Sequence, residues 1–226
     1  MGHPAGGPRQ VRLKTPLTPE AIAGLELGTV VYLDGRVYTG RERVYQRLVD
    51  EGAAPPVDFA SLGNVNFHCS PAAARRPGGG YKVGAVTATA SFRFAKWLDA
   101  WFEMSGAKAI IGKGGMSSEV YRRYFVPHGA VYLTTVGYGT GALLGRGVKR
   151  VAAVHWLEEF GIAQAMWVFD VEAFGPFIVE SDAAGNSLFE RENAKIASRL
   201  DALYAGSKPA ILGRYGETDD RGDEVI

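Results

Sequence analysis

The stretch AVTATASFRFAKWLD, residues 85–99, contains two side chains that could act together in acid–base chemistry. Thr89 carries a hydroxyl and Arg93 a guanidinium four residues later, and on a helix residues at this spacing share one face. Arginine binds carboxylates through two parallel hydrogen bonds, which suits a dicarboxylic substrate. A threonine hydroxyl becomes a base only where neighbouring cations and a dry site stabilise the alkoxide. The pattern alone favours the alternative, a helix-capping hydroxyl beside a surface arginine.

A second candidate site is AIIGKGGMSSEV, residues 109–120, where a buried-type strand leads into a glycine-flanked lysine and then into a helix. Gly112 and Gly114 would let the backbone approach a ligand, and Lys113 would present a point charge to an anion. A P-loop is excluded, because the GxxxxGK[ST] spacing is absent and Gly114 follows the lysine. The alternative is a tight turn that carries a solvated lysine.

Three further residues attract attention by type. Arg41 follows TVVYLDGRVYTG at an expected strand–loop–helix junction, where ligands are often bound, although a merely solvated arginine is the alternative. His68 and Cys69 are adjacent, but neighbouring residues of a strand point to opposite faces. A structural histidine and a buried, inert thiol are therefore expected. No pair of histidines has metal-ligand spacing, so the chain is expected to hold no metal.

The composition restricts the classes of partner. The 226 residues include 25 basic and 24 acidic ones, which gives a formal net charge of +1. This balance argues against nucleic acid or a membrane surface as the main partner, and no apolar run approaches the roughly 18 residues of a spanning helix. The one cysteine excludes a disulfide within the chain, indicates a reducing cytoplasm, and cannot hold a zinc ion or an iron–sulfur cluster by itself.

The elements that would position these residues form a mixed α/β pattern. Thr18 and Ser117 are expected N-caps of helices, and Asp34-Gly35 predicts the turn of a β-hairpin. Strand–loop–helix units then recur, and residues 91–106 and 187–206 read as helices. One domain with a mixed sheet and flanking helices is predicted over residues 13–205, between a flexible lead-in at 1–12 and a flexible tail at 206–226.

The ordered series LKTPLT, GTVVYLDGRVYTGR, AIIGKGG and HGAVYLTTVG resembles the β subunit of class I iron–sulfur hydro-lyases. These are the two-subunit fumarases and L-tartrate dehydratases, and the same unit is the C-terminal domain of one-chain class I fumarases. The segments VHWLEEFG, MWVFDVEAFGPFIV and AAGNSLFERENAK are most similar to the tartrate dehydratase β subunit. The resemblance runs from about Leu13 to about Leu203 and implies a single swivelling β/β/α domain.

The resemblance also implies a reaction, a partner and roles. The reaction is the reversible removal of water from a small hydroxy-dicarboxylate such as tartrate or malate, in the cytoplasm. A partner α subunit would hold a [4Fe–4S] cluster on its own cysteines, and αβ pairs would assemble further. Thr89 matches the catalytic base of the family. The matches to its substrate-binding positions are Arg93, Arg41, Lys113, Gly112 and Gly114.

The chain departs from the family around these residues. The family pattern Gly-Pro-Thr-Thr-x-x-Arg-Met corresponds here to Thr87-Ala88-Thr89-Ala90-Ser91-Phe92-Arg93-Phe94. Upstream, the family's Ala-Gly-Pro corresponds to Cys69-Ser70-Pro71. Replacing glycine by a larger residue narrows the space beside a substrate or alters the turn. The departures leave two hypotheses, a hydro-lyase with an altered substrate and a non-catalytic paralogue that serves as an anion-binding or assembly module.

Overall fold

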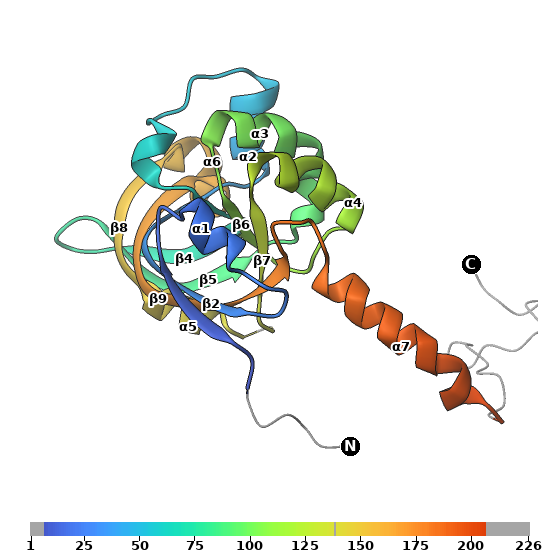
Figure 1. Cartoon of the computed structure of the whole chain (residues 1–226). Helices are drawn as coiled ribbons and strands as arrows, with labels where there is room; N and C mark the ends of the chain where they lie inside the picture. Colours follow the sequence, from blue (N-terminus) through green and yellow to red (C-terminus); the bar gives the residue numbers. More distant parts are fainter. Residues whose placement is uncertain (1–6, 138, 207–226) are drawn as a thin grey trace, which may run out of the picture. The chain divides into compact units, whose positions relative to one another are not determined.

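Most strands belong to one mixed sheet in the computed structural model, which describes residues 7–137 and 139–206 (Figure 1). The predictions for residues 1–6 and 207–226 therefore lie outside the described residues. The strands are β1 (Gln10–Lys14), β2 (Val30–Thr39), β3 (Val65–Phe67), β4 (Cys69–Arg75), β5 (Tyr81–Ala88), β6 (Ala109–Gly112), β7 (Val131–Thr135), β8 (Val148–His155) and β9 (Met166–Ser181).

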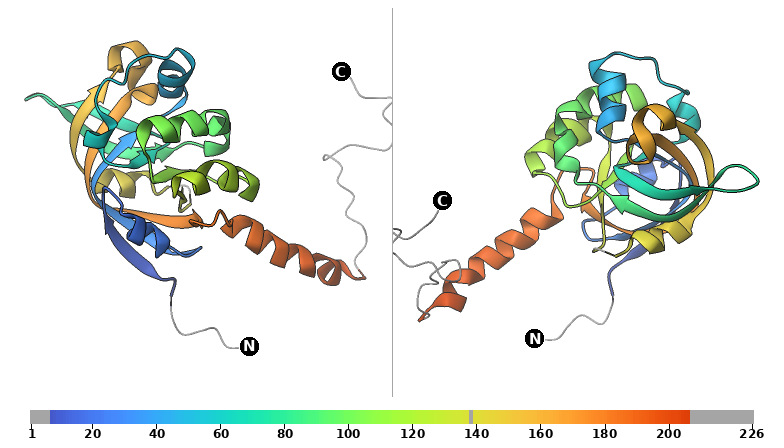
Figure 2. Two further views of the ribbon diagram at one scale, coloured as in Figure 1. Left: turned by 45° about the horizontal axis from the view of Figure 1, so that its top comes forward. Right: turned by 180° about the vertical axis from the view of Figure 1, so that it is seen from behind.

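The large sheet closes on itself. Its strand order is β1-β2-β3-β6-β7-β9-β8, and an additional pairing of β2 with β9 joins the two sides into a ring. Strands β1, β2, β3, β6 and β7 pair in parallel, whereas β9 is antiparallel to β2, β7 and β8. Strands β4 and β5 form a separate antiparallel ribbon that extends beyond the sheet (Figure 2).

Short helices connect the strands. The α-helices are α1 (Pro19–Ala23), α2 (Glu42–Tyr45), α3 (Leu98–Ser105), α4 (Ser118–Val120), α5 (Gly141–Gly147), α6 (Leu157–Gln164) and α7 (Leu188–Tyr204). The 3₁₀ helices are Phe59–Leu62, Ser91–Trp97 and Val126–His128, and the π-helical turns are Gln46–Asp50 and Tyr121–Phe125. The expected caps are confirmed, since Thr18 accepts from the Ala21 amide and Ser117 accepts from the Val120 amide.

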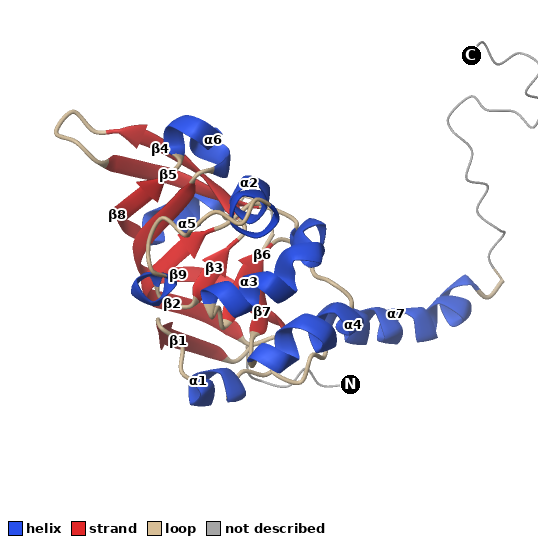
Figure 3. Cartoon of the chain, turned by 90° about the horizontal axis from the view of Figure 1, so that it is seen from above, coloured by secondary structure: helices blue, strands red, loops and turns tan. Residues whose placement is uncertain are grey.

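Two hydrophobic cores lie on opposite faces of the ring. Side chains alternate along a strand, so Ile111 and Leu133 point into the ring, whereas their neighbours Ile110 and Tyr132 point outward. The outer core is covered by α2, α3 and α4, which lie on one side of the sheet (Figure 3). Trp101 of α3 is fully buried there. The predicted α/β class with a mixed sheet and flanking helices is confirmed, and closure of the ring is the feature that the sequence pattern did not reveal.

The predicted β-hairpin at Asp34-Gly35 is wrong, because β2 runs through both residues as one strand. The Asp34 carboxylate accepts hydrogen bonds from the Arg12 side chain and the Ala173 amide instead of capping a turn. Gly35 has a φ of +102°, and the pairing of β2 with β9 shifts register between Leu33 and Gly35. The glycine therefore marks a bulge in a long strand.

The predicted flexible lead-in also needs correction. Residues 10–12 belong to β1, where Gln10 pairs with Val30 and Arg12 pairs with Tyr32. Alternation of polar and apolar residues in QVRLK is short, so this segment is only a weak strand pattern. A neighbouring strand supplied the hydrogen bonds that fix this segment.

The described chain divides into two compact units at Glu190 and Arg191. The first contains every strand, and the second consists of the remainder of α7, as far as the structure describes it. In the second unit, Ile196, Leu200 and Leu203 recur at the spacing of an amphipathic helix. Within the described ranges, no helix combines the length and apolarity that crossing a bilayer would require.

Replacing Gly35 by Ala tests the bulge. A Cβ at this position would lie 2.6 Å from Thr15 Oγ1 and 2.9 Å from the Thr15 carbonyl oxygen, on a backbone of positive φ. We expect Gly35→Ala to lower the free energy of unfolding by about 2 kcal/mol or more, measured by urea denaturation. Gly78→Ala is the matched control, since nothing lies within 4 Å of a Cβ there. Equal effects of the two substitutions would contradict this account of β2.

Candidate active site

The candidate residues meet at one edge of the ring. Strands β2, β3 and β6 are parallel, so their carboxyl ends lie at the same edge, and they are followed by Arg41, His68 and Lys113 respectively. Strand β5 brings Thr89 to this edge. The Thr89 amide donates to the His68 carbonyl at 2.6 Å, and the Lys113 amide donates to the Thr89 carbonyl at 3.1 Å. Thr89 and Lys113, which are 24 positions apart by subtraction of their residue numbers, are therefore neighbours.

Thr89 lies before the helix rather than on it. The 3₁₀ helix starts at Ser91 with Ala90 as N-cap, and a parallel bridge between Ala90 and Lys113 keeps the preceding backbone extended. The expectation that Thr89 and Arg93 share a helical face is thus wrong. The capping alternative is wrong too, because the N-cap makes no side-chain hydrogen bond. Thr89 is half-buried, and its hydroxyl makes no hydrogen bond within the part of the chain that the structure describes.

Two arginines lie close to Glu42. Arg41 is the N-cap residue of α2 and donates through Nη1 to the Ala163 carbonyl at 2.8 Å. Burial lowers the pKa of the Arg41 guanidinium, and the positive charge of Arg93 acts in the same direction. Arg93 Nη2 lies 3.6 Å from Glu42 Oε2, and its side chain is half exposed. Both cations therefore lie close enough to interact, and each has solvent access or an unpaired nitrogen to offer.

A cavity of about 340 Å³ opens beside this edge. Lys113 lines it, together with residues from the end of β5 and from α5, which include Thr87, Ala88 and Gly141. Small-molecule sites occupy roughly 300–1,000 Å³, so the cavity has the size of a small-ligand site. Thr87 and Ala88 stand where the resembling family has Gly-Pro, and both residues line the cavity.

The glycines beside Lys113 have different tasks. Gly114 has a φ of +73° and faces open space, so it supplies a backbone conformation that other residues rarely adopt. Gly112 is buried instead, and a Cβ there would overlap Ser91 Oγ and lie 2.5 Å from Tyr132 Oη. Gly112 makes room for a hydrogen bond between these two side chains. A direct role of Gly112 or Gly114 in binding a substrate remains a prediction.

A buried hydrogen-bond chain lies directly beneath the edge, and the sequence analysis did not identify it. Tyr132 Oη donates to Ser91 Oγ at 2.8 Å, and Ser91 Oγ lies 2.7 Å from His68 Nδ1. His68 Nε2 lies 2.7 Å from Tyr45 Oη, which donates to Asn66 Oδ1 at 3.2 Å. All five side chains are buried. The expected structural histidine is confirmed at His68, with both ring nitrogens bonded.

Donor counting fixes the direction of this chain. Tyr45 has one hydroxyl proton and gives it to Asn66, so it accepts from His68 Nε2–H. The other nitrogen, Nδ1, then accepts from Ser91, whose oxygen accepts from Tyr132. This arrangement requires a neutral imidazole. Burial, and then the nearby charge of Arg41, lower the pKa of His68 to about 3, so the ring is neutral at physiological pH.

A second buried polar group, the Glu180 carboxyl, packs against the loop that follows Lys113. Glu180 of β9 accepts hydrogen bonds from Tyr121 Oη and, at 2.6 Å, from Ser187 Oγ. Burial raises the pKa of Glu180, and these two hydrogen bonds oppose that shift. A Cβ on Gly115 would lie 2.9 Å from the Glu180 carboxyl carbon, so the loop rests closely on this side chain.

The donors of this chain do not fit an iron–sulfur cluster, which needs several thiolates. Cys69 is fully buried, and burial raises the pKa of its thiol well above the ordinary value. No group of three or more histidine, cysteine or acidic side chains with metal-binding geometry occurs in residues 7–137 and 139–206. The polar edge instead combines cations with a hydroxyl, an arrangement suited to holding a small anion.

The chain is therefore an α/β domain with a closed mixed sheet and cations gathered near one strand edge. The chain belongs to the family described as "Fumarase C-terminus", whose family model matches residues 3–192.

Relatives of this family cover most of the chain. The "Putative L(+)-tartrate dehydratase subunit beta" of Methanocaldococcus jannaschii is 32% identical over 190 residues, which cover 83% of this chain and 95% of that protein. The Escherichia coli K12 "L(+)-tartrate dehydratase subunit beta" is 29% identical over 84% of this chain and 92% of that protein. The "Putative fumarate hydratase class I" of Geobacillus stearothermophilus is 35% identical over 80% of this chain, but only 34% of that longer protein is matched.

The His68 ring predicts how stability depends on pH. An unfolded histidine binds a proton near pH 6.5, whereas the folded ring does so near pH 3, so acid favours the unfolded chain between these values. Protonation of His68 in the unfolded chain lowers the free energy of unfolding by about 1.4 kcal/mol for each unit by which the pH falls in this range. The His68→Gln variant lacks this pH dependence, because glutamine does not titrate. The difference in unfolding free energy between wild type and this variant should therefore shrink between pH 6 and pH 4, and a constant difference would contradict the assignment.

Removing the hydroxyl of Ser91 tests whether the buried chain holds the Thr89 segment. Ser91→Ala leaves Tyr132 Oη and His68 Nδ1 without their partner, which costs about 1–3 kcal/mol for each unsatisfied group. We expect the amides of residues 89–93 to exchange hydrogen at least tenfold faster, while amides of β1 and β9 change much less. Ser61→Ala, at an exposed serine, is the control. Uniform acceleration across the ring would indicate general destabilisation instead.

Proposed function

We propose that this chain is the β-type subunit of a hydro-lyase that reversibly removes water from a small hydroxy-dicarboxylate, such as tartrate or malate. The observation that carries the proposal is the meeting of Thr89, Arg41 and Lys113 at one strand edge, in a chain of this family. The relatives named as tartrate dehydratase β subunits match over nearly their full lengths, which supports the same kind of subunit here.

The cations would bind the substrate carboxylates. Arg41, Arg93 and Lys113 come from three different segments near the strand edge that carries Thr89, so two carboxylates at the ends of a short chain could each be held by a separate cation. Hydrogen bonds to charged groups contribute roughly 1.5–3 kcal/mol each. Binding by several cations also draws negative charge toward the edge and orients the carbon chain of the substrate.

Thr89 would be the base that takes a proton from carbon. Its hydroxyl oxygen accepts no hydrogen bond from any described residue, so its lone pairs are available to a substrate. Its amide and carbonyl are both bonded, to His68 and Lys113, which fixes the backbone at this position. An alkoxide here would be stabilised by the neighbouring cations once the cavity is closed to water.

A partner completes this proposal. An α subunit would carry the [4Fe–4S] cluster, because the donors of this chain do not fit one, and αβ pairs would assemble further. Such a cluster supplies Lewis-acid chemistry toward a substrate hydroxyl. A single cysteine among 226 residues agrees with a reducing compartment such as the cytoplasm.

A second candidate function is a non-catalytic module that binds an anion without turnover. Thr87 and Ala88 favour it, since they line the cavity at positions where the resembling family has Gly-Pro. The two functions differ in a measurable way. A reconstituted pair that binds a dicarboxylate but converts none of the tested hydroxy-dicarboxylates would favour the module.

The decisive variant is Thr89→Ala, assayed anaerobically after co-expression with an α-type subunit. General base catalysis contributes about 10²–10⁴-fold, so we expect kcat to fall at least 100-fold while KM changes little. Thr89→Ser should retain more activity than Thr89→Ala, because it keeps the hydroxyl.

Thr18→Ala is the matched control, since it removes the same atoms from the N-cap of α1. It should cost about 1 kcal/mol of stability and leave kcat unchanged. A Thr89→Ala complex as fast as wild type would remove Thr89 as the base.

A further inference from the structure

A depression of about 310 Å³ lies on another part of the first unit, between the β4–β5 ribbon, the end of α5 and the start of β8. Five cations line it, namely Arg76, Lys82, Arg146, Lys149 and Arg150, and none of the residues that line it is acidic. A neighbouring hollow of about 240 Å³ shares three of these cations. For a chain with a net charge of +1, this is a strong local concentration of positive charge.

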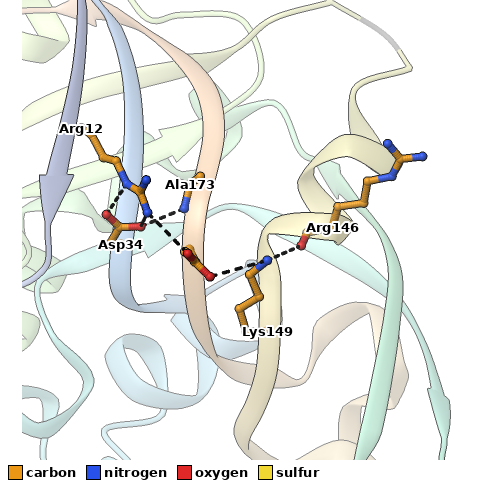
Figure 4. Close-up of polar contacts among 6 residues, drawn as sticks. Arg12, Asp34, Arg146, Lys149 and Ala173 are labelled. Atoms are coloured by element: carbon orange, nitrogen blue, oxygen red, sulfur yellow. Dashed lines mark hydrogen bonds and ion pairs between the residues drawn. The ribbon is translucent and has the colours of Figure 1, made fainter.

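Each of the nearest carboxylates, Glu172 and Asp170, is shared between one cation of the depression and one cation outside it. Glu172 lies 3.8 Å from Arg12 and 3.7 Å from Lys149, and Lys149 also donates to the Arg146 carbonyl at 3.5 Å. Figure 4 shows these contacts in a row from Arg12 to the Arg146 carbonyl. The guanidinium of Arg146 points away from this row of contacts. Asp34 belongs to the same network and is bound by Arg12.

Asp170 is likewise shared, because it pairs with both Arg36 and Arg150. Arg76, Lys82 and Arg146 make no ion pair with any residue in the part of the chain that the structure covers. The depression thus keeps an excess of positive charge after every local pair has been formed.

Backbone packing brings these cations together. A Cβ on Gly145 would lie 2.7 Å from the Gly84 carbonyl carbon, so α5 presses directly on β5 at this point. Arg146 follows Gly145, and Lys82 lies two residues before Gly84. Like charges held this close repel one another, and an anion between them removes the repulsion.

We propose that this depression is a second anion site, which binds a small ligand bearing phosphate groups. Guanidinium groups match phosphate oxygens in a forked geometry, and three of the five cations are arginines. The ring of Tyr81 already contacts Trp167 and Arg75, so recognition rests on the phosphate groups rather than on stacking with a base. The size of the hollow selects a small molecule.

This site is separate from the Lys113 cavity. Thr140, Gly141, Ala142 and Leu144 line the cavity at the start of α5, whereas Gly145 and Arg146 line the depression at its end. No residue is shared between the two linings. The inference therefore does not depend on the proposed hydro-lyase activity, and either one can fail alone.

Titration of the full chain with inorganic pyrophosphate tests the proposal, by calorimetry at constant ionic strength and by amide chemical shifts. We expect saturable binding of one pyrophosphate, with the largest shifts at residues 82–84 and 145–150. Arg146→Gln and Lys82→Gln should each weaken binding at least tenfold. Citrate should bind at least tenfold more weakly, because its carboxylates are spread over a branched carbon chain, whereas pyrophosphate gathers its charged oxygens on two linked phosphorus atoms.

Two matched controls separate this site from general electrostatics. Arg123→Gln removes an exposed arginine of the Tyr121–Phe125 turn, and Lys113→Gln removes the cation of the other cavity. Both should leave pyrophosphate binding within twofold of wild type, with unchanged melting temperatures for all variants. Absence of saturable binding, equal weakening by Arg123→Gln, loss in Lys113→Gln alone or equal binding of citrate would each overturn the proposal.

Discussion

The arrangement of the candidate site depends on the hydrogen bonds of His68. Its amide donates to the Ile111 carbonyl, and its carbonyl accepts from the Thr89 amide. Its ring bonds to Ser91 on one side and to Tyr45 on the other. One residue thus joins the end of β6, the end of β5, the 3₁₀ helix that carries Arg93, and the turn that begins at Arg41. Every candidate catalytic group lies within a few residues of a bond to His68.

A neutral imidazole is essential to this arrangement. The edge above it holds Arg41, Arg93 and Lys113, so a protonated ring beneath them would add like charge to a buried position. A neutral ring supplies one donor and one acceptor, which match the needs of Tyr45 and Ser91. The buried support beneath this edge is therefore uncharged and fully hydrogen-bonded at both ring nitrogens.

The sequence predicts those features that depend on local residue types. Thr18 and Ser117 cap helices as expected, because a cap needs only its own backbone neighbours. Arg41 and Lys113 could be placed at strand ends, and parallel pairing brings these ends together. The family resemblance then supplied roles that no local pattern contains.

Long-range contacts explain the failures. Asp34-Gly35 has the composition of a turn, but β1 and β9 pair along both sides of β2 and keep it extended. The helix expected to carry Thr89 starts after it, because Ala90 pairs with Lys113. The bonds of His68 reach residues 23 positions away in both directions. Asn66 lies in β3 and His68 directly follows this strand, so at a spacing of two residues they point to the same face, and both are buried. This spacing of two polar residues is the one sequence feature that indicates the buried hydrogen-bond chain.

The most direct test is a crystal structure of the chain bound to its α-type partner and to a hydroxy-dicarboxylate such as malate or tartrate. The account predicts carboxylates in contact with at least two of Arg41, Arg93 and Lys113, and Thr89 Oγ1 within about 3.5 Å of the carbon that loses its proton. A ligand bound elsewhere, or a Thr89 hydroxyl more than about 5 Å from every substrate carbon, would contradict it.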